Sequence, residues 1–345
     1  MFRKEIFVIL SVVMLFRAGL AQAVEDRYIY SDAIIEEGDE YANVYIYDTP
    51  PHHTTVNMTG GKASNIYTYD ASMLNVTGGT TEISAHNRST VNVTGGTIYT
   101  LDAREFSTAN ISGGYVHGAS ARDSATVNLS DNGSLLSLSA RGSFGTVNMT
   151  GGSAEYARAG DSGTLNLYGG VVTNSLNAWD SAAINIFGYD LFKTATGGTY
   201  GYGFVTGFWC EGTPFNINFN TSETHSYVNL IPVLYVGVDI KPESLNLAGK
   251  GNWITCHIYL PQDYNVNDID SKSIVLARDS NEIKPEWLWF NEDKQVVMAK
   301  FNRADVCEIL EAGDIGLTIR GHLADGTCFE GADTIRVIER GHTND

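Results

Sequence analysis

The stretch that decides the fold reads Val91-Asn92-Val93-Thr94-Gly95-Gly96. An Asn stands between two apolar residues, and a glycine pair follows shortly after. Outward from this stretch, in both directions, the central Asn returns every 17 to 20 residues. A repeat this regular is typical of an array of stacked structural units. The eight copies are centred on Asn57, Asn75, Asn92, Asn110, Asn128, Asn148, Asn166 and Asn185.

The length and pattern of the repeat indicate strands. Helical repeats need about 34 residues, whereas this unit has close to 18. Apolar and polar residues alternate over short β-branched runs, which is the pattern of a half-buried strand. We therefore predict an all-β chain in which residues 24–195 form a parallel β-helix, or β-solenoid. We expect three strands in each coil and coils stacked at about 4.8 Å.

The repeated Asn is predicted to form a structural ladder. Because side chains alternate along a strand, the two valines flanking Asn92 point inward and Asn92 points outward. Asn side chains in register can hydrogen-bond from one coil to the next. The glycine pair marks a corner, since glycine adopts a positive φ without a steric penalty.

A second column of polar residues lies five residues before each Asn. It reads Asp70, Asn87, Glu105, Asp123, Ser143, Asp161 and Asp180. Two arginines, Arg104 and Arg122, directly precede two of these acids. One interpretation is a ligand strip, in which carboxylates bind a divalent cation or sugar hydroxyls. The other is a set of turn residues that cap backbone N–H groups at a corner. The candidate ligand strip comprises Asp70, Glu105, Asp123, Asp161, Asp180, Arg104 and Arg122.

The start of the chain and its charge indicate export. Arg3 and Lys4 precede an apolar run over residues 6–15, and Ala21-Gln22-Ala23 has the small residues of a cleavage site. Residues 1–23 are therefore predicted to be a signal peptide that is removed after Ala23. The expected location is secreted, periplasmic or at the cell surface, with no transmembrane segment. A net charge of −18 disfavours nucleic acid as a partner.

The second half of the chain lacks the repeat. Residues 196–236 are rich in aromatic residues and are predicted to cover the open end of the solenoid. Residues 237–345 are predicted to form a β-sandwich of short strands. The expected strands are 253–260, 273–277, 296–301, 315–320 and 334–338, with one short helix at 303–311.

The cysteines all lie outside the repeats. In an exported chain Cys210, Cys256, Cys307 and Cys328 permit two disulfides, with three connectivities. Free cysteines are the alternative. Their spacing is not that of a zinc site.

Two parts of the chain resemble known families. The strings over 56–61, 91–96 and 147–152 resemble the short repeats of adhesin-type autotransporters and related secreted bacterial β-solenoids. Residues 238–340, with Val238-Asp239-Ile240-Lys241-Pro242 and Gly326-Thr327-Cys328-Phe329-Glu330-Gly331, resemble a C-terminal module of secreted archaeal and planctomycete proteins. The resemblance implies an exported protein with an extracellular accessory domain.

The function predicted from these features is non-catalytic. The chain has no nucleophile elbow, zinc-protease helix or phosphate loop. We expect an exported structural or adhesive protein, with no catalytic residue, no metal site and no cofactor beyond a weak suggestion of calcium. Its expected partners are extracellular polysaccharide or other cell-surface proteins. The alternative is a carbohydrate-binding or polysaccharide-lyase-like module that uses the acid–arginine strip and the aromatic residues of 196–236.

Overall fold

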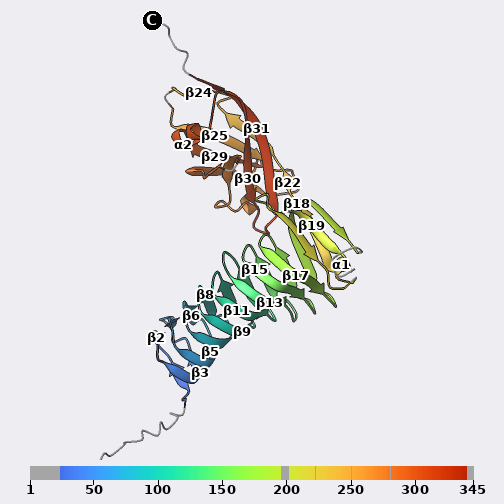
Figure 1. The fold of residues 1–345 in the computed structure, drawn as a ribbon. Helices are drawn as coiled ribbons and strands as arrows, with labels where there is room; N and C mark the ends of the chain where they lie inside the picture. The colour runs from blue at the N-terminus through green and yellow to red at the C-terminus, as the bar shows by residue number, and fades with distance from the viewer. Residues whose placement is uncertain (1–23, 196–201, 222, 250, 280, 340–345) are drawn as a thin grey trace, which may run out of the picture.

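The computed structural model describes residues 24–195, 202–221, 223–249, 251–279 and 281–339. Its first half is a parallel β-solenoid of about eight turns. Figure 1 shows the coils stacked from the N-terminal blue strands to the green ones, with further sheets beyond the last coil. The prediction of an all-β chain built on a parallel solenoid is confirmed.

The predicted signal peptide, residues 1–23, lies outside the described residues. Within the described part of the chain, no helix has the length and apolar character needed to cross a membrane.

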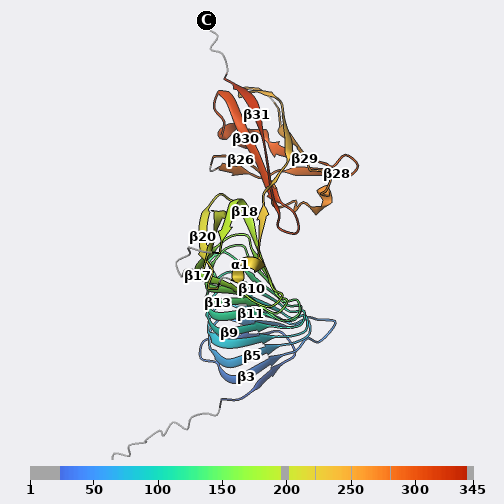
Figure 2. The same cartoon turned by 90° about the vertical axis from the view of Figure 1, so that its right-hand side faces the viewer.

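Successive coils build two parallel sheets, which Figure 2 shows from the side. Equivalent residues of neighbouring coils lie in register, so that Asn110 is opposite both Asn92 and Asn128. Sheet A consists of β1 (Arg27–Ile29), β3 (Glu40–Ile46), β5 (Lys62–Thr68), β7 (Thr80–Ala85), β9 (Thr97–Ala103), β11 (Tyr115–Ala121), β13 (Ser134–Ala140), β15 (Ser153–Ala159) and β17 (Val171–Ala178). Sheet B runs through β2 (Ala33–Ile35), β4 (Thr55–Met58), β6 (Met73–Val76), β8 (Thr90–Val93), β10 (Thr108–Ile111), β12 (Thr126–Leu129), β14 (Thr146–Met149), β16 (Thr164–Leu167) and β18 (Ala183–Thr194).

Each coil has two strands, not the three predicted. In the coil of β8 and β9, the buried Ile98 and Leu101 are separated by two exposed residues, Tyr99 and Thr100. A straight strand would alternate inward and outward side chains. The pair of outward residues therefore bends β9, and the expected second and third strands form one continuous bent strand.

The glycine pair is required by the stacking of corners. Gly96 has a φ of +82°, a conformation that side chains rarely adopt. At Gly95 a Cβ would lie 2.3 Å from the carbonyl oxygen of Thr77 in the coil below. The two glycines thus allow consecutive corners to approach each other at strand spacing.

One apolar core fills the solenoid. It runs from Ile29 to Val228, and the inward residues of the repeat, such as Val91 and Val93, are fully buried. Burial of a Val or Ile side chain contributes about 1.5–3 kcal/mol. Since each coil covers the next, this stabilisation depends on the neighbours.

The C-terminal end of the solenoid is covered by an antiparallel extension of sheet B. β18 continues into β19 (Phe204–Phe208) and β20 (Pro214–Asn218). The rings of Trp209 and Phe215 stack, and both join the solenoid core. After α1 (Thr224–Tyr227), β21 (Val228–Pro232) returns to pair in parallel with β18. The predicted capping segment 196–236 includes these elements, although its first residues, 196–201, lie outside the described part.

A separate C-terminal unit follows, with two sheets around its own core. That core contains Ile258 and Phe301 from the smaller sheet and Ile319 and Ile335 from the larger one. The larger sheet consists of β22 (Leu234–Tyr235), β24 (Ser244–Asn246), β26 (Val275–Arg278), β27 (Asn281–Ile283), β30 (Gly313–His322) and β31 (Cys328–Ile338). The smaller sheet consists of β23 (Gly237–Lys241), β25 (Trp253–Tyr259), β28 (Trp287–Asn291) and β29 (Val296–Asn302). The helical segments are η1 (Val266–Asp268) and α2 (Arg303–Glu308).

Candidate functional site

The eight repeated Asn residues form one column on sheet B. From Asn75 onward, each side-chain amide donates to the carbonyl oxygen of the Asn in the preceding coil, over 2.8–3.0 Å. A ninth member, Asn229 of β21, donates to Asn185 over 2.9 Å. Sequence spacing missed Asn229 because the capping segment separates it from Asn185 by 44 residues. The amides bond to one another, so the ladder serves the scaffold.

The acidic column lies at the corner between sheet A and sheet B. Six of its members have a left-handed backbone with φ between 56° and 60°, namely Asp70, Asn87, Glu105, Asp123, Asp161 and Asp180. Asp and Asn tolerate this conformation better than most residues. In the remaining coil Gly142, with φ of +73°, takes the position assigned from sequence to Ser143. That coil has a longer corner, and the extra residue shifts Ser143 out of register.

Several of these acids already have partners in the scaffold. Glu105 accepts a hydrogen bond from the Asn87 backbone N–H over 2.7 Å, and Asp161 accepts one from Gly142 over 2.9 Å. Asp70 accepts from the Asn87 side chain over 3.0 Å. Among the described residues no group of three or more His, Cys, Asp or Glu side chains is placed to hold a metal ion.

Arg104 and Arg122 bind a carboxylate that was not in the predicted strip. Arg104 contacts Asp102 through Nη2 at 2.6 Å and Nε at 2.8 Å, and Arg122 through Nε at 2.9 Å. Ser120 donates to the same carboxylate over 2.6 Å. Asp102 is 6% exposed, whereas the arginine side chains are 45% and 46% exposed. The strand pattern held one signal for Asp102, an acid between Leu101 and Ala103.

Two adjacent columns of side chains run along the solenoid at the end of the sheet A strands, and Arg104 and Arg122 belong to the outer one. The strand-end column is Tyr28, Tyr45, Tyr67, Ser84, Asp102, Ser120, Ser139, Arg158 and Asn177. The outer column, two residues further on in each coil, is Tyr30, Tyr47, Tyr69, His86, Arg104, Arg122, Arg141, Gly160 and Trp179. We call the arginines Arg104, Arg122, Arg141 and Arg158 the arginine strip.

Two members of the arginine strip stack on aromatic rings. The Arg141 guanidinium carbon lies 5.5 Å from the Trp179 ring centroid, and that of Arg158 lies 5.0 Å from the Tyr156 ring. Trp179 reaches Arg141 across Gly160, where a Cβ would come within 2.3 Å of the indole. Cation–π contacts of this kind hold a guanidinium in place without neutralising it.

At the N-terminal end the same two columns are aromatic. Tyr28, Tyr45 and Tyr67 stack with ring centroids 4.8 and 5.1 Å apart. Tyr30, Tyr47, Tyr69 and His86 form the second stack, with separations of 5.0 to 5.4 Å. Burial raises the pKa of Tyr69 and lowers the pKa of His86.

A shallow groove of about 520 Å³ adjoins the outer column at this end. It brings together Asp70 and Glu105 of the predicted strip with Asp48 and the exposed Phe106. Burial opposes ionisation of Asp48, but the His53 side chain, at 2.9 Å, and the Thr54 N–H lower its pKa on balance. Asp123, Asp161 and Asp180 do not line this groove.

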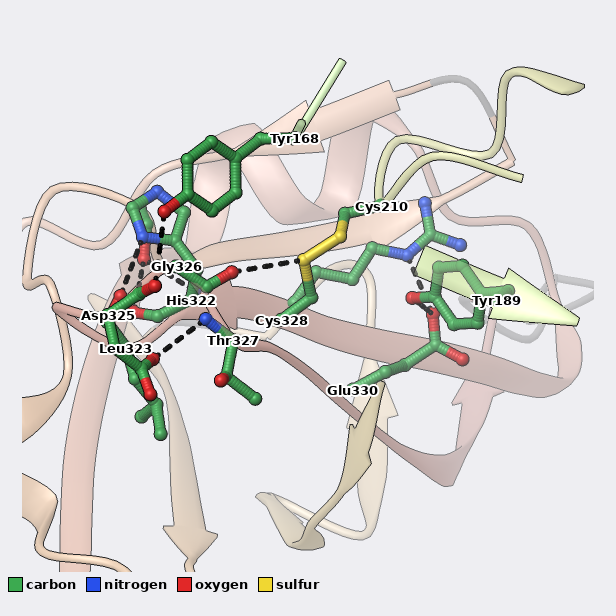
Figure 3. Close-up of a disulfide and its surroundings, with 12 residues drawn as sticks. Tyr168, Tyr189, Cys210, His322, Leu323, Asp325, Gly326, Thr327, Cys328 and Glu330 are labelled. Carbon is green, nitrogen blue, oxygen red and sulfur yellow. Dashed lines mark hydrogen bonds and ion pairs between the residues drawn. A yellow bond between two sulfur atoms is a disulfide. The ribbon is translucent and has the colours of Figure 1, made fainter. Parts of the chain in front are cut away.

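A second groove, of about 990 Å³, lies where the solenoid meets the C-terminal unit. Its solenoid side includes Asn128, Asn148 and Asn166. Figure 3 shows the disulfide Cys210–Cys328 that closes this junction. Beside it, the Tyr189 hydroxyl donates to Glu330 over 2.8 Å. Burial is the main cause that raises the pKa of Tyr189, and the hydrogen bond to Glu330 raises it further. The other two cysteines, Cys256 and Cys307, are free.

No protein-family model matches the chain, and no curated protein or solved structure matches it either.

Proposed function

We propose that this chain is a non-catalytic, exported structural or adhesive protein of a cell surface or extracellular matrix. The observation that carries the proposal is the continuity of the solenoid. One apolar core passes through all the coils, and one Asn ladder runs without interruption from Asn57 to Asn229. Stacked repeats of this kind behave as a rod whose side faces are long and uniform. Such a rod suits a spacer or an adhesive surface.

Export is supported by two independent features. The first 23 residues have the sequence of a signal peptide. The Cys210–Cys328 disulfide joins segments 118 residues apart, and disulfides persist in oxidising compartments. On these grounds we propose a location outside the cytoplasm. The resemblance of residues 238–340 to modules of secreted proteins supports a secreted bacterial protein of planctomycete type. The two C-terminal sheets are interpreted as the β-sandwich of an extracellular accessory module.

The absence of catalysis is inferred from what the acids do. Glu105 and Asp161 accept bonds from backbone N–H groups, and Asp102 binds two arginines. A general acid or base must exchange a proton with its substrate. These carboxylates bind groups of the scaffold and hold the coils and the arginines in position, so we infer that they are not general acids or bases.

Carbohydrate binding is the second candidate. Aromatic side chains and arginines share one face of sheet A, and sugar-binding surfaces use both. On this view the extracellular partner is a polysaccharide, and the rod presents the surface that holds it.

Both candidates are tested on the full chain in a bacterial host. Fractionation, compared with a form lacking residues 2–23, should find the full chain outside the cytoplasm with its disulfide formed. The purified protein is then screened against immobilised polysaccharides, with and without calcium, and for product release. Export without turnover supports the proposal, whereas cytoplasmic retention or depolymerised polysaccharide would contradict it.

A further inference from the structure

The arginines of the solenoid are unevenly distributed. Residues 24–195 contain six arginines, and four of them form the arginine strip. The chain as a whole carries a net charge of −18. Four guanidinium groups gathered in two neighbouring columns therefore contrast with the rest of the molecule and mark a surface for an anion.

The strip has too few counter-charges of its own. Arg104 and Arg122 share the single carboxylate of Asp102. Within the described residues, neither Arg141 nor Arg158 forms an ion pair. Arg141 lies over Trp179, and Arg158 lies over Tyr156 and donates to the Ser137 hydroxyl over 3.3 Å. The four arginines come from four consecutive coils, whose backbones are stacked about 4.8 Å apart, so their charges repel one another. An external anion would relieve this repulsion.

The nearby acids do not neutralise the strip. Glu105 directs its carboxylate along the corner to the Asn87 N–H, and Asp161 directs its own to the Gly142 N–H. Asp123 follows Arg122 in the chain, but Arg122 pairs with Asp102. The carboxylates of the corner thus serve the turn, and within the described residues Arg141 and Arg158 have no carboxylate partner.

Aromatic rings continue the strip in both directions along the solenoid axis. Trp179 stands beyond Arg141, and Tyr69 and His86 stand before Arg104 in the outer column. Tyr69 and His86 stack on each other and Arg141 lies over Trp179, so these rings add aromatic surface beside the guanidinium groups, which C–H groups of a pyranose ring can contact. A guanidinium binds a carboxylate or sulfate through two parallel N–H groups. The columns therefore place guanidinium groups for the acidic groups of a charged sugar chain between aromatic residues for its rings.

We propose that the arginine strip and its flanking aromatic residues bind a linear acidic polysaccharide along the solenoid axis. The inference rests on the proposed extracellular role and names the ligand class of its binding surface. Single-stranded nucleic acid also combines anions with stackable rings. The net charge of −18 opposes any polyanion away from the strip, so charge alone does not separate the two polymers. The proposed extracellular role favours the sugar chain, and nucleic acid binding is an outcome that the test decides.

The test measures binding of the full chain to four polymers. Polygalacturonate supplies carboxylates, dextran sulfate supplies sulfates, dextran is the neutral control, and poly(dT) represents nucleic acid. Binding should be measurable for at least one acidic polysaccharide. Its affinity should fall as sodium chloride rises from about 50 to about 500 mM, because the added salt shortens the Debye length to a few ångströms and screens the ion pairs.

Matched variants place the effect on the strip. Arg141→Gln with Arg158→Gln should weaken binding of the acidic polymer at least about tenfold. The control, Lys62→Gln with Lys284→Gln, removes the same charge from exposed sites outside the strip and should change affinity less than about threefold. Arg158→Gln alone, which leaves Trp179 covered by Arg141, should give an intermediate loss in a protein with unchanged circular dichroism.

The outcomes separate this inference from the proposed function. Equal losses in both double variants, preference for dextran, or tighter binding of poly(dT) would overturn the assignment of the strip. If the exported protein binds a neutral polysaccharide, the assignment of the arginine strip is overturned but the proposed adhesive role stands. An exported protein that binds no polymer would overturn the strip and leave only a structural rod.

Discussion

At the scale of single residues, Asp102 organises the candidate surface. Its buried carboxylate accepts bonds from Arg104, two residues further along the same coil, and from Ser120 and Arg122 of the next coil. A buried charge is tolerated only when it is paired and hydrogen-bonded. Asp102 therefore sets the direction of two arginines whose side chains remain nearly half exposed.

We expect Asp102→Ala to destabilise the solenoid by about 1–3 kcal/mol, because two adjacent guanidinium groups lose their counter-ion and part of the pairing is screened by solvent. Chemical denaturation of the variant and the parent measures the difference. Ser84→Ala, in the same column one coil earlier, is the control and should cost less than about 0.5 kcal/mol. Similar effects of the two substitutions would show that Asp102 does not organise the arginines.

His86 predicts a pH effect. Burial lowers its pKa below the usual 6.5, with Arg104 adding to the effect and Glu105 and Asp102 opposing it. In the window just below 6.5 the unfolded chain therefore binds more protons than the folded one. The contribution of His86 to stability thus falls as the pH drops through this window and is constant above it.

Replacement of His86 should flatten this dependence. His86→Tyr extends the stack of Tyr30, Tyr47 and Tyr69, and His86→Gln removes both the ring and the charge. The difference in Tm between pH 7.5 and pH 5 should shrink in both variants. These two pH values lie on either side of the ordinary pKa of His, about 6.5. An unchanged difference in the two variants would exclude His86 as the source.

At the scale of elements, the coil is the unit that the repeat builds. Its two strands are stabilised by burial on the inside and by hydrogen bonds between identical residues on the outside. Asn128 illustrates this arrangement, because it donates to Asn110 and accepts from Asn148. Asn57, at the start of the ladder, accepts from Asn75 and lies exposed. The two positions have the same residue in different hydrogen-bonding states.

Asn128→Ala should therefore cost more than Asn57→Ala. Removal of the middle member breaks two bonds, at about 1 kcal/mol each, whereas removal of the first breaks one exposed bond worth less. Urea titration and hydrogen exchange of the flanking strands measure the two effects, and exchange should rise around β12 and β14 for Asn128→Ala. Equal losses would mean that the ladder follows the backbone register without adding to stability.

At the scale of the whole molecule, the disulfide fixes the solenoid to the C-terminal unit. Cys210 follows the β19 strand of the capping segment, and Cys328 begins β31. Tyr168 adds a bond to the Asp325 carbonyl oxygen, and Tyr189 adds one to Glu330, which also binds Arg320 (Figure 3). Polar contacts of this number would hold an interface weakly without a covalent link.

Loss of the disulfide should loosen this junction. Cys210→Ser with Cys328→Ser should lower stability by about 2–5 kcal/mol and expose the connection around Val233 to proteolysis. Limited proteolysis followed by mass spectrometry locates the cut. Cys307→Ser, at a free cysteine, is the control and should leave the digestion pattern unchanged. A parent-like pattern in the double variant would show that the non-covalent contacts suffice.

The solenoid was largely predictable because its determinants are local and repeated. Every copy carries the same alternation, so errors in one coil are corrected by the others. The strands predicted at 253–260 and 296–301 likewise match β25 and β29, whose apolar and polar residues alternate. β24 and β27 were not predicted, since edge strands of three residues leave too short a pattern. The assignment of Ser143 to the acidic column was wrong for another reason: the corner at Gly142 is one residue longer, which shifts the register there.

The sequence by itself determined the β-solenoid, its Asn column and the left-handed corner positions, because each follows from a spacing repeated in every coil. Only the tertiary structure decided the pairing of Arg104 and Arg122 with Asp102, the contact of Trp179 with Arg141, the ninth rung at Asn229 and the choice of Cys328 as the partner of Cys210. Apart from the Arg104–Asp102 pair, whose members are two residues apart, these contacts join residues on different coils or different units. Their distances depend on how the chain stacks and folds back, which no spacing along the sequence records.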